Sequence, residues 1–339
     1  MTEGSPARLL LLFALPLMLG NVFQQCYTIA DTLIVSRRLG VDALAALGTA
    51  DWYIYLVISI VQALAQGFSI LLAQQFGAGD EKSLRRSFAQ SVLLCAVFGV
   101  LLTAAAELSV PGVLRILRVP DEIRPMTSLY IAILFAGIGA QMLYNFTASV
   151  LRAFGNSRTP FVAMVLASLL NIALDLLFVL VLPWGVAGAA AATVISQVFS
   201  GLWCLVPLRR ITAVAGITRS ELAPVWDVDR KLLMLAAPMV MQNILISVGG
   251  MIVESVVNSF GVDFVAGFTA TNKLYGALEM AAVAYGFACT TFTGQNYGAG
   301  KWERVRRGVK EGTLLSVATG AAIGTFMILT GRYITGAFL

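Results

Sequence analysis

Histidine is absent from this sequence of 339 residues, and charged residues make up only 12% of it, about half the share found in soluble proteins. The absence of histidine excludes His-based zinc sites, His-containing catalytic triads and histidine proton relays. The four cysteines show no Cys-x-x-Cys spacing and lie within apolar runs. We therefore expect buried thiols rather than disulfides or metal ligands.

Apolar residues are correspondingly abundant. Ala, Val, Ile, Leu, Met, Phe, Trp, Tyr and Cys together make up 58% of the chain, and the mean hydropathy is +0.84. A soluble domain of this length cannot bury so much apolar surface, so lipid must be the main solvent of the folded chain. This excludes a soluble enzyme, a nucleic-acid-binding protein and a disordered chain. The net charge of +5 therefore needs a membrane explanation.

Long stretches without charge predict the membrane-spanning helices, since a helix needs about 20 apolar residues to cross the bilayer. The turn Pro183-Trp184-Gly185 divides one longer stretch, which holds only Asp175, into two. We predict an all-α polytopic membrane protein. Its nine transmembrane helices are expected at residues 9–36, 44–76, 87–110, 126–151, 160–182, 186–207, 231–259, 264–297 and 310–337.

The distribution of Lys and Arg between the loops predicts the orientation of the chain. If the N-terminus is cytoplasmic, the cytoplasmic segments carry 16 of the 23 Lys and Arg residues and the opposite side carries 7. Cytoplasmic loops of membrane proteins are enriched in these two residue types. We therefore predict a cytoplasmic N-terminus.

The sequence contains an internal repeat. Gln74–Gly79 (QQFGAG) recurs as Gln295–Gly300 (QNYGAG), and the pair at 85–86 (RR) recurs at 306–307, each with an offset of 221 residues. Around these motifs, 11 of 47 aligned positions are identical. Six predicted helices separate equivalent points, and an even number of helices preserves orientation. The two halves are therefore expected to be parallel repeats around an axis along the membrane normal.

The repeat predicts two six-helix lobes that face each other across a cavity. We place the first lobe at residues 1–215 and part of the second, its first three helices, at residues 225–339. Leu339 aligns with Arg118, just past the third helix of the first half. On this spacing, the counterparts of helices four to six, about a hundred residues, are missing. We expect the chain to be a fragment or a truncated gene product.

A set of motifs in a fixed order resembles one family. The motifs are Pro16 followed by Tyr27–Thr32 (YTIADT), Gly77–Gly79 (GAG), the segment 151–160 (LRAFGNSRTP), the segment 171–175 (NIALD) and the segment 185–193 (GVAGAAAAT). With the duplicated six-helix layout, the whole chain resembles the multidrug and toxic compound extrusion (MATE) transporters. The resemblance implies a twelve-helix protein that exports lipophilic, usually cationic compounds against a proton or sodium gradient. The nine helices predicted here depart from that number.

Carboxylates inside predicted spans are candidates for ion coupling, because a carboxylate at this depth must be protonated, paired or hydrated. Asn171 lies four residues before Asp175, on the same helix face. The resemblance implies a first-lobe cation site, for H⁺ or Na⁺, at Asp31, Asn171, Asp175 and Thr193. Two structural alternatives stay open. Asp31 could form an interfacial ion pair with Arg37 and Arg38, and the Asn–Asp pair could only join packed helices.

Other polar side chains within the spans are candidates to line the substrate cavity, because they face partners or water rather than lipid. These candidates are Gln24, Tyr27, Tyr144, Asn145, Gln242, Glu254 and Glu279. Glu254 aligns within one residue of Asp31 in the repeat, so it is a candidate partner for a cationic drug or ion. Alternatively, it only hydrates the cavity. Pro16 removes a backbone hydrogen bond midway along the first helix, so it is the expected hinge.

These observations together predict a secondary active multidrug exporter rather than an enzyme. It is expected to exchange lipophilic, cationic compounds for H⁺ or Na⁺ without another cofactor. The expected partners are drug-like small molecules and the lipid bilayer, without nucleic acid, and the expected state is a monomer in the bacterial inner (plasma) membrane.

Three alternatives to this function were weighed. A related flippase for a lipid-linked saccharide would favour a cationic cavity for pyrophosphate, whereas the central charged residues predicted here are acidic. An intramembrane prenyltransferase or protease would need Asp-rich or His-based metal motifs, which the predicted spans lack. The third alternative is a fragment that does not transport.

Overall fold

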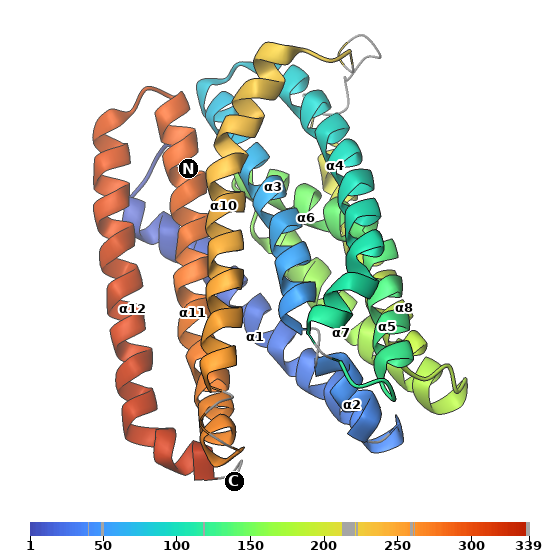
Figure 1. Cartoon of the computed structure of the whole chain (residues 1–339). Helices are drawn as coiled ribbons and strands as arrows, with labels where there is room; N and C mark the ends of the chain where they lie inside the picture. Colours follow the sequence, from blue (N-terminus) through green and yellow to red (C-terminus); the bar gives the residue numbers. More distant parts are fainter. Residues whose placement is uncertain are drawn as a thin grey trace.

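The computed structural model describes residues 1–39, 41–48, 51–117, 119–211, 221, 223–257, 260 and 262–336. Over these residues the chain forms helices and no β-strand. Figure 1 shows the long helices lying side by side, with the N-terminus beside α11 and α12. The all-α fold class predicted from the sequence is confirmed.

The helices follow the predicted spans in order. They are α1 (Pro6–Leu39), α2 (Val41–Gly48), α3 (Asp51–Ala78), α4 (Glu81–Ile116), α5 (Arg124–Ala136), α6 (Ile138–Ala153), α7 (Arg158–Asp175), η1 (Leu176–Val181), α8 (Val186–Leu208), α10 (Trp226–Val257), α11 (Val262–Gly298) and α12 (Trp302–Gly336). Seven helical segments of the described chain are long and apolar enough to cross a membrane, or eight if the bent pair α5–α6 is one span. The span predicted at 264–297 coincides with α11, many of whose side chains lie outside the description. A ninth span therefore stays a prediction.

Two of the predicted spans are interrupted rather than continuous. The span predicted at 44–76 consists of α2 and α3. The span predicted at 126–151 bends by 44° between α5 and α6, at Gly137. A Cβ atom on Gly137 would overlap the side chain of Val194 on α8. The chain therefore turns where only glycine lets the backbone approach the neighbouring helix so closely.

The span predicted at 160–182 changes its helix type. α7 ends at Asp175, and the following residues, Leu176–Val181, form the π-helix η1. A π-helical turn is rare and frequently marks a functional site. The change of helix type therefore falls directly beside the carboxylate that the sequence singled out.

Equivalent helices of the two halves make equivalent contacts. α3 and α11 both end in a glycine with a positive φ of 69°, Gly79 and Gly300, and these glycines are 221 residues apart. α10 lies along α3 (Figure 1), where a Cβ on Gly67 would overlap the backbone of Ala236. In the repeat, Gly67 corresponds to residue 288 and Ala236 to residue 14, and these two alanines share one buried cluster between α11 and α1.

The larger hydrophobic core is centred on α3. Val61, Phe68 and Leu72 are fully buried in it, and α3 packs against α4, α6, α10 and α11. This helix therefore joins the first half of the chain to the second. The predicted boundary between the lobes, at 215–225, falls mostly on residues outside the description, so the limits of the lobes stay a prediction.

The contact between α3 and α10 leads to a test of stability. We expect Gly67→Ala to lower the thermal midpoint of the detergent-purified protein, because overpacking of a tight contact costs about 1–3 kcal/mol. Gly99→Ala on α4 is the matched control, since an added Cβ there meets nothing within 4 Å. Equal midpoints for the two variants would contradict the close contact.

Candidate functional site

A cavity of about 580 Å³ lies between helices of the two halves. Its walls come from α1, α3, α5, α6, α7 and α8 of the first half and from α11 of the second. The volume is in the range of small-molecule sites, which is about 300–1,000 Å³. The polar lining residues are Asn21, Gln24, Gln25, Tyr55, Gln62, Tyr130, Gln141, Tyr144, Asn145, Ser149, Arg152, Ser168, Asn171, Thr193, Ser196, Gln197, Ser200 and Glu279.

The structure brings together most of the candidate residues whose side chains it describes. The cavity candidates Gln24, Tyr144, Asn145 and Glu279 line the cavity together with Asn171 and Thr193 of the predicted cation site. Asp31, Tyr27 and Glu254 lie in helices, but their side chains are outside the described residues. Pro16 lies inside the continuous helix α1.

Gln242 is the exception among the described candidates, since it is not one of the cavity-lining residues. The neighbouring Asn243 points from α10 toward α3 and donates a hydrogen bond to the carbonyl oxygen of Ser59 at 2.9 Å. Successive side chains of a helix point about 100° apart. Gln242 is therefore exposed on another face of α10, and its placement in the cavity was wrong for that reason.

A buried polar cluster joins α7 to α8 behind the cavity wall. Asp175 is fully buried and Asn171 is 3% exposed. In the amide orientation favoured by its surroundings, the Asn171 side chain donates to Asp175 Oδ2 at 3.1 Å and accepts from the Thr193 backbone N–H at 3.2 Å. The Thr193 hydroxyl donates to the carbonyl oxygen of Ala189 at 3.2 Å. Three of the four residues of the predicted cation site therefore form one cluster.

This cluster connects a buried carboxylate to the cavity. Asp175 itself is not a lining residue, whereas Asn171 and Thr193 are. Any change in the charge of Asp175 therefore acts on the cavity wall through its hydrogen bond with Asn171. The same geometry limits metal binding, because the amide nitrogen of Asn171 faces the carboxylate. A Na⁺ ion held by both residues would need the amide to rotate, since cations are bound by oxygen.

The cavity contains a basic residue that the sequence reasoning missed. Arg152 ends α6, donates to Ser149 Oγ at 3.1 Å and stacks on the ring of Phe287 from α11, 4.4 Å from the ring centroid. Glu279 is an acid in the same lining. Both signs of charge are therefore present among the described lining residues, and the expectation of a purely acidic centre was wrong. Arg152 could have been found as the charge that closes the predicted span 126–151.

Parallel repeats around a ligand-sized cavity between transmembrane helices are typical of secondary transporters. The comparison with known proteins agrees with that class. The family model described as MatE matches residues 16–177 and 238–339. The chain belongs to the MATE family of membrane transporters, as the motifs predicted.

Individual relatives support this assignment. "Probable multidrug resistance protein YpnP" of Bacillus subtilis is 34% identical over 305 residues, which are 90% of this chain and 68% of that protein. The structure "Reverse polarity of binding pocket suggests different function of a MOP superfamily transporter", from Pyrococcus furiosus, matches with a TM-score of 0.91 and 26% identity over 98% of this chain and 74% of that chain. "Outward-facing conformation of a multidrug resistance MATE family transporter of the MOP superfamily" matches with a TM-score of 0.90 and 26% identity over the same shares of the two chains, 98% and 74%.

The α7–α8 cluster leads to a second test. We expect Asn171→Leu to destabilise the detergent-purified protein by about 1–3 kcal/mol, because a buried carboxylate loses a donor and a backbone N–H loses an acceptor. The measurement is the thermal midpoint. Leu169→Ala on the same helix is the control, since Leu169 is 59% exposed. A wild-type midpoint for Asn171→Leu would show that the cluster does not hold the two helices together.

Proposed function

We propose that the chain exports lipophilic, cationic compounds across the bacterial inner membrane as a monomer, in exchange for H⁺ or Na⁺. The observation that carries this proposal is the buried Asp175–Asn171 pair, which adjoins a cavity of about 580 Å³ in a member of the MATE family. An ionisable group within a membrane protein is a functional candidate by default. The N-terminus is placed in the cytoplasm on the distribution of Lys and Arg.

Ion binding at Asp175 would act on the substrate through the wall of the cavity. Loading the carboxylate with a proton or Na⁺ weakens its hold on the Asn171 amide, which also lines the cavity. α1 packs against α7 at this wall, where the rings of Phe23 and Phe161 lie 6.4 Å apart. Pro16 lacks the backbone N–H of an ordinary helical residue, so α1 can bend there. We propose that this bend narrows the cavity and expels the substrate.

Aromatic and acidic residues on the cavity wall support a cationic substrate. Tyr55, Tyr130 and Tyr144 line the cavity together with Glu279. Aromatic faces attract cations, and a carboxylate adds a direct charge pair. Amphipathic cations can therefore be held with their apolar part against the remaining wall.

Replacing the buried carboxylate tests the coupling. We expect Asp175→Asn to abolish ion-driven efflux of a cationic dye from cells, because the amide can neither load nor release a proton and carries no charge for Na⁺. The control is Asp121→Asn, since the Asp121 side chain is 85% exposed in a surface pair with Arg124. Dye export by Asp175→Asn at the wild-type rate would contradict the proposal.

The choice between the two ions is made in the same assay with everted membrane vesicles. A pH gradient without Na⁺ drives uptake into the vesicles if the ion is H⁺, and a Na⁺ gradient at equal pH drives it if the ion is Na⁺. Export that responds to neither gradient would overturn antiport with these ions.

Neutralising the cavity acid tests the substrate class. We expect Glu279→Gln to weaken the binding of a cationic dye by about two- to fivefold, as is typical of an exposed ion pair, and to leave a neutral lipophile unaffected. Fluorescence titration of the purified protein measures both affinities. Glu303→Gln is the control, since the Glu303 side chain is 91% exposed at the start of α12. Equal losses for charged and neutral ligands would contradict a role of the charge.

Arg152 favours one second candidate function, a flippase for a lipid-linked saccharide. Its guanidinium lines the cavity, and arginine binds phosphate groups in a bidentate manner. Binding of an isoprenyl diphosphate that is lost in Arg152→Gln, together with no binding of cationic dyes, would favour this function over drug export.

A further inference from the structure

The duplicated glycine motif forms a contact between the two halves that the transport proposal does not use. A Cβ on Gly77 of α3 would overlap the backbone carbonyl of Gln295 on α11. A Cβ on Gly298 of α11 would likewise overlap the backbone carbonyl of Gln74 on α3. The ends of the two helices therefore touch through their backbones, and only glycine permits the approach.

The two overlaps are one contact made twice. Gln74 and Gly77 correspond to Gln295 and Gly298 through the offset of 221 residues. Each repeat therefore presents the same surface to the other, as in a two-fold symmetric interface, where a residue and its partner exchange roles. The motif recurs because both copies are needed for the same contact.

This contact closes one end of the cavity. The last residue of α3 that lines the cavity is Gln62, and the last one of α11 is Phe287. Gln74 lies 12 residues beyond Gln62, about 18 Å further along the helix axis. At this end the side chain of Gln295 also donates to the carbonyl oxygen of Ala153 at 2.7 Å. The end of the molecule that holds Met1 is therefore sealed between α3, α6 and α11.

A second layer of contacts covers the sealed end, and it repeats as well. Gln90 on α4 is fully buried and holds the segment that leads into α10, donating to the carbonyl oxygens of Glu221 at 2.9 Å and Ala223 at 2.8 Å. Glu311 on α12 is its counterpart at an offset of 221, and it holds the segment that leads into α1 by accepting from the Ala7 backbone N–H at 2.6 Å. Each third helix thus fastens the entry to the other repeat.

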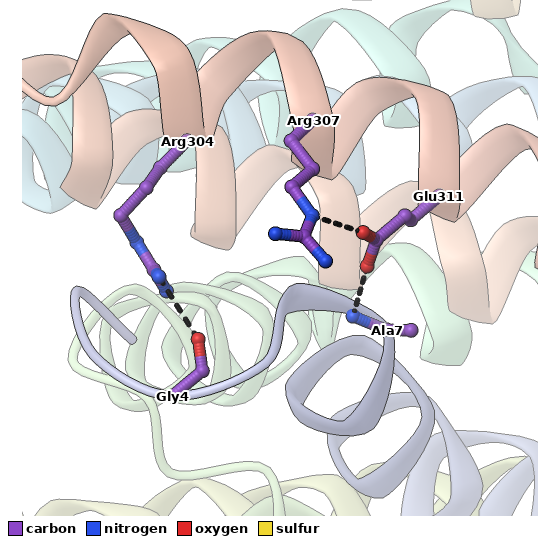
Figure 2. A network of polar contacts seen from close by, with 5 residues as sticks. All are labelled: Gly4, Ala7, Arg304, Arg307 and Glu311. Carbon is purple, nitrogen blue, oxygen red and sulfur yellow. Dashed lines mark hydrogen bonds and ion pairs between the residues drawn. The ribbon is translucent and has the colours of Figure 1, made fainter.

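The fastening by Glu311 differs from its counterpart in its chemistry, as Figure 2 shows. Glu311 also accepts from Arg307 Nε at 2.5 Å, and Arg304 Nη1 donates to the carbonyl oxygen of Gly4 at 2.9 Å. We call residues 1–7 the N-terminal strap. The Gln90 fastening holds the connection between the halves, whereas the strap is held by charged side chains at the surface, where water competes for the same groups.

We propose that Gly77 and Gly298 position the two repeats in the closed state of this end, and that the N-terminal strap is the latch that must leave Glu311 and Arg304 when the end opens. Both layers join α1 and α3 of the first half to α11 and α12 of the second. Rocking of the halves against each other therefore cannot open this end while either layer is in place. A larger residue at either glycine shifts the equilibrium toward the open state.

Distance measurement by pulsed electron paramagnetic resonance tests this proposal. Nitroxide labels are attached at Lys82→Cys and Glu303→Cys, which are exposed and equivalent in the repeat, after Cys26, Cys95, Cys204 and Cys289 are replaced by Ser. We expect one short distance in this background. In Gly77→Ala or Gly298→Ala, the ratio of a longer to the short distance should rise about tenfold, equivalent to about 1.4 kcal/mol.

Matched variants separate the two layers. Gly286→Ala on α11 is the control for the glycines, since an added Cβ there meets nothing within 4 Å. Glu311→Ala tests the strap, with the exposed neighbour Lys310→Ala as its control, and we expect a rise in the longer distance for Glu311→Ala alone.

Three results would overturn the proposal in whole or in part. Wild-type distances in both glycine variants would refute their positioning role, and wild-type distances in Glu311→Ala would refute the latch. If the glycine variants fail to fold, Glu311→Ala decides on the gate. The experiment needs no transport, so a failed gate leaves the export proposal intact.

Discussion

Close contact between helices at small residues is the constraint on which this structure depends. Lipid tails are as apolar as leucine side chains, so packing one apolar helix on another in a membrane relies on van der Waals contact more than on the hydrophobic effect. α10 can lie along α3 because Gly67 and Ala236 are small, and α1 meets α11 in the same way at Ala14 and Ala288. Large apolar side chains such as Ile328, 84% exposed, are left to face the lipid.

The same solvent restricts where polar groups can lie. Without water, a polar side chain must find a partner inside the protein or border a cavity. The Asp175–Asn171 pair does the first and the polar lining of the cavity does the second. The two arrangements meet at Asn171, which belongs to both. A charge buried behind the wall and a substrate in front of it are therefore joined by one side chain.

The repeat conserves backbone geometry more closely than chemistry. The glycine contacts and the helix ends at Gly79 and Gly300 are the same in both halves, because the approach of two backbones allows no other residue. Positions that differ, such as Gln90 and Glu311, keep their place and partner segment but exchange an amide for a carboxylate. Symmetry thus determines how the halves meet, and side-chain differences determine which half can let go.

The sequence by itself determined the all-α membrane fold, the order of its helices and the family, since hydrophobic length and duplicated motifs are local properties of the chain. It also singled out Asp175, Asn171 and Thr193. Only the tertiary structure decided that Arg152 shares a cavity with Glu279 and that Gln242 does not. It also decided that the Gly77 and Gly298 motifs touch each other. Those facts depend on the rotation of each helix and on contacts between residues more than 100 positions apart, and no local pattern encodes them.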